Sequence, residues 1–253
     1  PLSISWSAAS DPDGDSIKYN VFLGTNSSNL TLVSNSQEGL SYISGILELD
    51  ETYYLRVDAI AGTHTTPSET RKFTTSNNGV FVDSRDGQSY GTIKIGAQVW
   101  MTENLKYNST GSYSYDNLSS NDDTYGRLYD WVNVSTAIPS GWHLPTDSEW
   151  QALETHLGMP SSDLNINNYS SPRGTDQGTQ LKQGGSSGLN FPLAGFRSGG
   201  TYSALNNRTY LWVNTDAGGG NIFRRRLVSN DPSCYRFTNP TAGFAISVRL
   251  IKD

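Results

Sequence analysis

Short runs in which apolar and polar residues alternate, separated by clusters of turn-forming residues, recur along most of this 253-residue chain. In the clearest run, Tyr53, Leu55, Val57 and Ala59 occupy every second position. Successive side chains of a strand point to opposite faces of its sheet, so this run predicts a strand with one buried face and one solvated face. The charged fraction of only 17% and the many glycines favour strands joined by turns over an all-α fold. We therefore expect a mainly β protein with a small α+β part.

A short polar segment from Thr75 to Gly79 contains no apolar residue and separates two regions of different texture. Such a segment is typical of a domain boundary. The chain length also suits two modest domains, because a single hydrophobic core usually serves roughly 100 to 200 residues. We predict one domain over residues 1–76 and a second over residues 77–253.

The first region is expected to form a β-sandwich. An alternating run ends at Trp6, and a turn-rich segment follows at residues 11–15. Together with residues 49–59 and the closing residues 73–75, these features resemble a fibronectin type III module. The resemblance implies a fibronectin III-like β-sandwich with Trp6 in its second strand.

Residues 1–7 correspond to the second strand of that module, so the sandwich is expected to lack strand A. Its open edge would leave backbone donors and acceptors unpaired. Two explanations stay open: the chain is a piece of a longer polypeptide, or a neighbouring polypeptide fills the gap by strand addition. The first is the simpler explanation.

The second region begins with a predicted meander of strands. Residues 80–82 and 90–95 alternate in polarity around an Asp-Gly turn, and residues 98–101 are extended again. Two further strands are predicted over residues 211–214 and 244–252.

One helix stands out in the second region. Thr146 and Glu149 have the spacing of a capping box, an apolar stripe at i, i+3 and i+7 follows, and Gly158 is expected to end the helix. We also predict a shorter helix over residues 127–132. Residues 161–188 are rich in glycine, serine, asparagine and glutamine and are expected to form long loops.

Several segments of the second region resemble a bacterial domain family that is widespread in Fibrobacter and Bacteroidetes surface proteins, the Fibrobacter succinogenes major paralogous domain. The matching segments are residues 82–107, 125–134, 141–153, 189–200 and 247–253. The resemblance implies a C-type-lectin-like fold, shared with the formylglycine-generating enzyme, in which long loops surround one or two helices and a twisted antiparallel sheet. It also places Ile138 and Leu250 where the family typically has cysteines, so an apolar contact replaces a disulfide that would contribute about 2 to 4 kcal/mol.

The charge of the chain excludes some partners. A net charge of −6 and no long basic run leave no cationic field for nucleic acid. The one basic cluster, Arg224 to Arg226, would point to different sides of a strand, and we interpret it as solvated rather than as an anion contact. No apolar stretch approaches the roughly 20 residues that span a bilayer, so we expect no membrane span.

The residues of the chain do not indicate an enzyme. A formylglycine-generating activity uses a pair of cysteines to bind copper, and Cys234 is the only cysteine. The three histidines show no metal-ligand spacing. We interpret His143 as a core or hydrogen-bonding residue.

Calcium is the one cofactor that the sequence suggests. Asp11, Asp13 and Asp15 alternate around a glycine, and hard cations prefer such oxygen ligands. The segment lacks the later glutamate of an EF-hand loop, and turn formation also explains it. Asp122 and Asp123 form a second, weaker candidate cluster.

The candidate ligand-binding residues lie in the second region. Trp212, Asn214 and Asp216 are reminiscent of the Trp-Asn-Asp stretch that contributes calcium and sugar ligands in C-type lectins, although the spacing differs. Trp212 could stack on a sugar ring, or it could be a core residue beside a polar strand end. The loops supply the remaining candidates, which are Tyr202, Asn206, Asn207, Arg208, Tyr210, Asn221 and Arg224.

We therefore expect an extracellular or cell-surface bacterial protein, an adhesin or ligand-binding module, with the fibronectin-like domain as a spacer. Its ligand is a glycan or a protein. The alternative is a structural subunit of a surface fibre or filament, assembled by strand addition at the open first domain. An enzyme would need an acid, base or metal site that the residues do not reveal.

Overall fold

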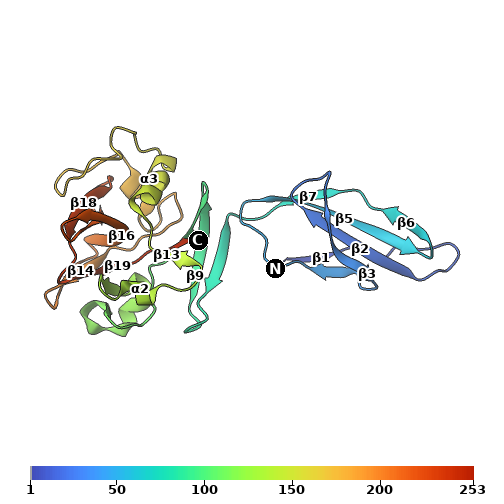
Figure 1. Cartoon of the computed structure of the whole chain (residues 1–253), viewed down its shortest axis with the longest axis horizontal. Coiled ribbons are helices and arrows are strands. Elements are labelled where there is room, and N and C mark those ends of the chain that lie inside the picture. Colours follow the sequence, from blue (N-terminus) through green and yellow to red (C-terminus); the bar gives the residue numbers. More distant parts are fainter. Residues whose placement is uncertain (1) are drawn as a thin grey trace. The chain divides into compact units, whose positions relative to one another are not determined.

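The structure is a computed structural model that describes residues 2–253. It confirms the mainly β class, with 42% of residues in strands and 12% in helices. The chain forms two compact units, Pro1–Asn78 and Gly79–Asp253 (Figure 1).

The first unit contains two antiparallel sheets. The larger has the order β3-β2-β5-β6, and β7 also pairs with β5. The smaller sheet pairs β1 with β4. The strands are β1 (Ser3–Ser5), β2 (Ile17–Gly24), β3 (Thr31–Gln37), β4 (Ser41–Ile43), β5 (Thr52–Ala61), β6 (His64–Pro67) and β7 (Arg71–Thr74).

The prediction of a strand at β5 is confirmed, but the prediction of one buried and one solvated face is wrong. Its apolar residues are only half-buried, and the buried residue is Asp58 on the opposite face. Asp58 tolerates burial because its carboxylate accepts two hydrogen bonds from Arg56, at 2.8 and 3.0 Å. The facing sheet has only two strands, so it cannot enclose the apolar side of β5. The small core is formed instead around β2, where Trp6 packs edge-on against Tyr19.

The second unit begins with the predicted meander, which the structure confirms. Its sheet has the order β13-β20-β10-β9-β8. The strands are β8 (Asn78–Val82), β9 (Ser89–Ile95), β10 (Gln98–Met101), β13 (Trp142–His143) and β20 (Ile251–Lys252).

A second sheet in this unit has the order β11-β12-β19-β14-β16-β17-β18, with β15 paired to β14. The strands are β11 (Ser112–Tyr113), β12 (Leu128–Asp130), β14 (Ala194–Ser198), β15 (Thr201–Leu205), β16 (Arg208–Gly218), β17 (Asn221–Val228), β18 (Tyr235–Pro240) and β19 (Phe244–Ser247). The strand predicted at 211–214 is thus the middle of β16. The strand predicted at 244–252 is split, because β19 and β20 belong to different sheets.

The main helix is α3 (Asp147–His156), and its predicted capping box is present: the Thr146 side chain accepts from the Glu149 backbone, and Glu149 reaches back to Thr146. Gly158, with φ of +86°, follows its end. The helix predicted at 127–132 is wrong, because the backbone there pairs with two strands as β12. The other helical elements are η1 (Tyr115–Asn117), η2 (Ser119–Asn121), α1 (Asp122–Tyr125), α2 (Val134–Ala137) and α4 (Gln177–Leu181).

The core of the second unit consists of two main apolar clusters. One contains Leu250, and the partly buried Ile138 packs against this cluster. The other contains Trp100 and Trp150, whose rings meet edge-on at 5.1 Å. Within the described residues, no helix combines the length and apolar character needed to cross a membrane.

Candidate ligand-binding site

The three consecutive arginines of β17 are buried, so their interpretation as solvated side chains is wrong. They alternate across the sheet, as expected of a strand: Arg225 lies on the face toward α3, and Arg224 and Arg226 lie on the opposite face. Sequence pattern alone missed their burial because long-range segments cover both faces. Arg225 forms ion pairs with carboxylates, whereas Arg224 and Arg226 donate to backbone carbonyls.

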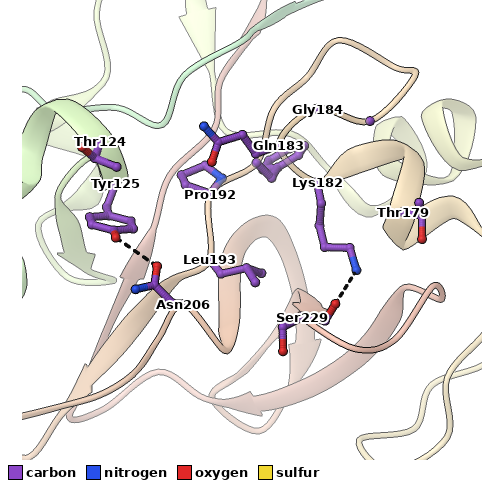
Figure 2. Close-up of a pocket in the computed structure, with 12 residues that line it drawn as sticks. Thr124, Tyr125, Thr179, Lys182, Gln183, Gly184, Pro192, Leu193, Asn206 and Ser229 are labelled. Atoms are coloured by element: carbon purple, nitrogen blue, oxygen red, sulfur yellow. Dashed lines mark hydrogen bonds between the residues drawn. The ribbon is translucent and has the colours of Figure 1, made fainter.

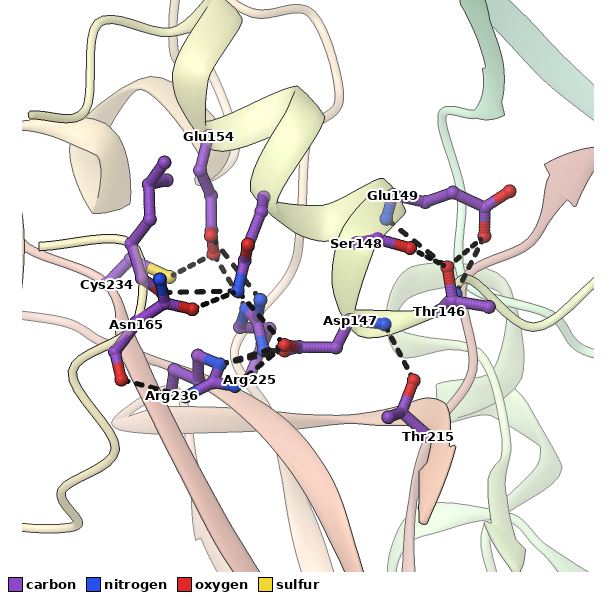
Figure 3. A network of polar contacts seen from close by, with 12 residues as sticks. Thr146, Asp147, Ser148, Glu149, Glu154, Asn165, Thr215, Arg225, Cys234 and Arg236 are labelled. Atoms are coloured by element: carbon purple, nitrogen blue, oxygen red, sulfur yellow. Dashed lines mark hydrogen bonds and ion pairs between the residues drawn. The ribbon is translucent and has the colours of Figure 1, made fainter. Parts of the chain in front are cut away.

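On the α3 face, Arg225 and Arg236 bind buried carboxylates (Figure 3). Arg225 donates to Glu154 at 2.7 Å and to Asp147 at 2.8 Å. Arg236 also binds Asp147, at 2.7 Å, and Arg173 binds Glu154. Burial alone would raise the pKa of Asp147, but its hydrogen bonds to Arg236 and Arg225 outweigh this and the pKa is lowered. This network is a structural ion cluster that ties α3 to the sheet.

Cys234 lies beside the same network, with its Sγ 3.6 Å from a Glu154 oxygen. Burial, reinforced by the nearby Glu154 charge, raises the pKa of its thiol to about 12. The thiolate is the reactive form of cysteine, so this side chain is chemically inert at neutral pH.

On the opposite face, Arg224 lies at a pocket of about 310 Å³, which we call the Arg224 pocket. It is lined by residues of one loop and five strands: Tyr169, Phe196, Tyr210, Arg224, Thr238, Asn239, Phe244 and Ile246. Aromatic walls with a few polar groups and one charged group are typical of a small-ligand site.

Arg224 is 1% exposed and forms no ion pair within the described residues. Its guanidinium carbon lies 4.6 Å from the Trp212 ring centre and 4.7 Å from that of Phe244. One hydrogen bond runs from Nη2 to the Pro240 carbonyl, at 2.5 Å, and Nε has no hydrogen-bond partner. Burial without a counter-charge lowers the pKa of Arg224 to about 10.

The rim of the Arg224 pocket carries two phenol groups. The hydroxyls of Tyr169 and Tyr210 are 3.4 Å apart. Arg226 helps to hold the backbone of Tyr169 in place, because its Nη2 donates to the Tyr169 carbonyl at 2.8 Å. Tyr169 itself is 48% exposed, so the pocket opens to solvent next to it.

Of the predicted ligand residues, only Tyr210 and Arg224 meet at this pocket. The prediction of Trp212 as a ligand residue is wrong. Trp212 is completely buried and its Nε1 donates to the Tyr129 carbonyl at 2.7 Å, so its ring cannot stack on an external sugar. Asn214 and Asp216 are exposed near the end of β16, outside the Arg224 pocket.

The other predicted ligand residues lie at strand ends and hairpin turns rather than in long loops. Tyr202 donates to Asn117 at 2.8 Å. Asn206 and Asn207 form the turn between β15 and β16, while Arg208 begins β16 and Asn221 begins β17. None of them lines the Arg224 pocket. The sequence missed Thr238 and Asn239 because β18 was not predicted as a strand.

A second pocket, of about 410 Å³, is shown in Figure 2. Its Lys182 is fully engaged, because Nζ donates to the carbonyls of Val228, Ser229 and Asp231 at 2.9 to 3.1 Å. Tyr125 likewise donates to Asn206 at 2.9 Å. Lys182 and Tyr125 therefore already have hydrogen-bond partners within the protein, whereas the Nε of Arg224 has none among the described residues.

A third cavity, of about 610 Å³, is bordered by His143, Asn214 and Asp253. The two ring nitrogens of His143 lie 2.9 Å from Glu149 and 2.6 Å from Asp253. This confirms the interpretation of His143 as a hydrogen-bonding residue. Desolvation lowers its pKa, but the two carboxylates outweigh desolvation and the pKa is raised.

Stability is expected to depend on the charge of His143. Because its pKa is higher in the folded state than in the unfolded state, its contribution is complete below about pH 6.5 and is lost as the pH rises through the folded pKa. We expect His143→Gln to lower the melting temperature more at about pH 5.5 than at about pH 8. Thermal denaturation at both pH values measures this, with His156→Gln as the matched control. An equal loss at both pH values would contradict the prediction.

The candidate calcium segment, Asp11 to Asp15, forms a turn in the structure. Within residues 2–253, no group of three or more histidine, cysteine, aspartate or glutamate side chains is placed to hold a metal ion. The Asp11 carboxylate instead accepts hydrogen bonds from the backbones of Asp13 and Asp15, at 2.9 and 3.2 Å. The acidic segment therefore forms a turn, the alternative that its composition had allowed.

Comparison with known proteins bears on the second unit. The family described as the Fibrobacter succinogenes major domain matches residues 93–252. No curated protein and no solved structure matches the chain. The matched segment includes α3, both faces of β17 and every residue of the Arg224 pocket. Since it covers more than half of the chain, the protein belongs to the Fibrobacter succinogenes major domain family.

Proposed function

We propose that this protein is an extracellular bacterial surface protein that acts as an adhesin or ligand-binding module, and that the Arg224 pocket is its ligand site. The observation that carries the proposal is a solvent-open aromatic pocket with a buried polar group that lacks a partner. In native proteins, buried polar groups are almost always hydrogen-bonded, and an exception calls for an explanation. A bound ligand provides one.

The proposed architecture assigns different roles to the two units. The order β3-β2-β5 with β7, together with the separate pair β1-β4, supports a fibronectin III-like spacer. A single main helix beside antiparallel sheets supports a C-type-lectin-like fold for the second unit. In this proposal the second unit presents the ligand site and the first holds it away from the cell.

A glycan array probed with the full chain tests the proposal. We expect selective glycan binding that becomes about tenfold weaker in Tyr169→Ala, because the half-exposed ring borders the pocket. Tyr54→Ala is the matched control, since Tyr54 is a partly exposed tyrosine of the first unit. Binding that Tyr54→Ala abolishes and Tyr169→Ala leaves intact would assign recognition to the other unit. An array without binding would contradict a glycan ligand.

The first unit supports a second candidate function, a subunit of a surface fibre. Among the described residues, β1 and β4 pair only with each other, so the outer edge of each strand is open. Exposed apolar residues lie on β4 and just after it, with Ile43 70% and Ile46 87% exposed. An open strand edge with apolar residues favours pairing with a strand of another chain.

The fibre candidate predicts concentration-dependent polymers that Ile43→Lys disrupts, because a charge on a strand edge opposes pairing. Light scattering over a range of protein concentrations measures this. A chain that stays monomeric throughout the range would end this candidate, while leaving ligand binding by the second unit untouched.

A further inference from the structure

Three buried arginines of the second unit differ in the partners that their guanidinium groups have. Arg225 is neutralised by Asp147 and Glu154. Arg249 has no carboxylate partner but donates four hydrogen bonds to neutral acceptors, two to the Asn104 side chain and two to main-chain carbonyls. Arg224 has neither a carboxylate nor such a set of acceptors.

Arg226 on the same strand also donates a single hydrogen bond and has an Nε–H without an acceptor among the described residues, but of the two only Arg224 lines the pocket. The single hydrogen bond of Arg224, to the Pro240 carbonyl, leaves its Nε–H without an acceptor among the described residues, although only 1% of the residue is exposed. Leaving a buried charged donor without an acceptor is costly, and a charge-assisted hydrogen bond to an anion removes that cost. No described carboxylate pairs with Arg224, so an anion that accepts from its guanidinium would come from a ligand.

The remaining lining describes the rest of the ligand. Phe196 and Tyr210 meet edge-on at 5.2 Å and form an aromatic wall. The polar groups are the hydroxyls of Tyr169, Tyr210 and Thr238 and the amide of Asn239, which suit a polyhydroxylated molecule. A volume of about 310 Å³ lies at the small end of ligand sites, so it accommodates one sugar ring rather than a long chain.

We propose that the Arg224 pocket binds an acidic sugar residue of the hexuronate type, with the ring against the aromatic wall and the carboxylate accepting from the Arg224 guanidinium. This inference rests on the proposed ligand-binding function and names the class of its ligand. A peptide carboxylate offers the same anion, but it lacks the hydroxyl groups that would use Thr238 and Asn239.

The test is a titration of the full chain, followed by ¹H–¹⁵N NMR at the arginine Nε–H signals. The probes are D-glucuronate, its neutral methyl ester, D-glucose, acetate and N-acetylalanine. We expect D-glucuronate to shift the Arg224 Nε–H signal, identified by its absence in Arg224→Lys. The ester and glucose should bind about tenfold more weakly or worse, because they lack the carboxylate. Acetate should also bind more weakly, because it lacks the ring.

Variants test the same contact from the protein side. Arg224→Gln should weaken D-glucuronate binding at least about tenfold, while Arg224→Lys should keep part of it, since lysine retains the charge but not the planar donor set. Arg197→Gln is the matched control: Arg197 is an arginine on β14 packed over Tyr113 and outside the pocket. Should Arg224→Gln fail to fold, the comparison of D-glucuronate with its ester decides alone.

Each other outcome has a definite meaning. Equal binding of D-glucuronate, the ester and glucose would overturn the assignment of an acidic ligand while the proposed function stands. Stronger binding of N-acetylalanine than of D-glucuronate would replace the sugar by a peptide carboxylate and overturn it as well. If the glycan array binds selectively but no probe perturbs the Arg224 signal, the inference fails and a ligand site elsewhere is required.

Discussion

Glu154→Gln is expected to destabilise the second unit by about 3 to 5 kcal/mol, the usual cost of breaking a buried ion pair by removing one partner. Glu154 is completely buried and receives hydrogen bonds from Arg173 and Arg225. Glutamine keeps the shape of the side chain but removes the negative charge. Arg173 would then lose its carboxylate partner, and Arg225 would share the single carboxylate of Asp147 with Arg236.

Urea denaturation followed by near-ultraviolet circular dichroism measures this loss. Asp123→Asn is the control, because the Asp123–Lys106 pair is of the same kind but Asp123 is 85% exposed, and such pairs contribute about 0 to 1 kcal/mol. A Glu154→Gln variant no less stable than Asp123→Asn would show that the network does not hold α3 on the sheet.

Trp212→Ala is expected to cost a similar amount, about 3 to 5 kcal/mol, which is typical of removing a large aromatic side chain from a core. The ring of Trp212 is fully enclosed and packs at 5.2 Å from that of Trp131. The substitution also leaves the Tyr129 carbonyl without its 2.7 Å donor and removes the ring beneath Arg224.

The same denaturation experiment separates a core role from a ligand role for this tryptophan. Trp131→Ala serves as the comparison, since Trp131 is only half-buried and should cost clearly less. If Trp212→Ala retained wild-type stability and lost only glycan binding, Trp212 would be a surface platform after all, contrary to its enclosure in the structure.

The contrast across β17 connects stability with recognition in this unit. On one face of the strand, Arg225 binds Asp147 and Glu154 of α3, and these ion pairs tie the helix to the sheet. The other face keeps Arg224 over aromatic rings without a carboxylate. Packing and ion pairs that hold the supporting element behind a site help to preorganise that site.

Some features of this protein were determined by the sequence alone, because they depend on neighbours in the chain. The capping box of Thr146 and Glu149 spans a single helical turn, so its spacing predicted where α3 begins. The meander of β8, β9 and β10 also follows from short turns and local alternation. The failed helix at 127–132 marks the limit, because pairing with β11 and β19 overrode the local preference.

Other features were decided only by the tertiary structure. Nothing near Arg224 or Arg225 in the chain distinguishes the two arginines, yet Arg225 meets carboxylates 71 and 78 positions away and Arg224 meets none. The pocket itself joins a loop to five strands, and Trp212 became core because Tyr129 and Trp131 lie against it. Burial and charge pairing depend on which distant segments pack together, and the free energy of that packing is a property of the whole fold rather than of any local pattern.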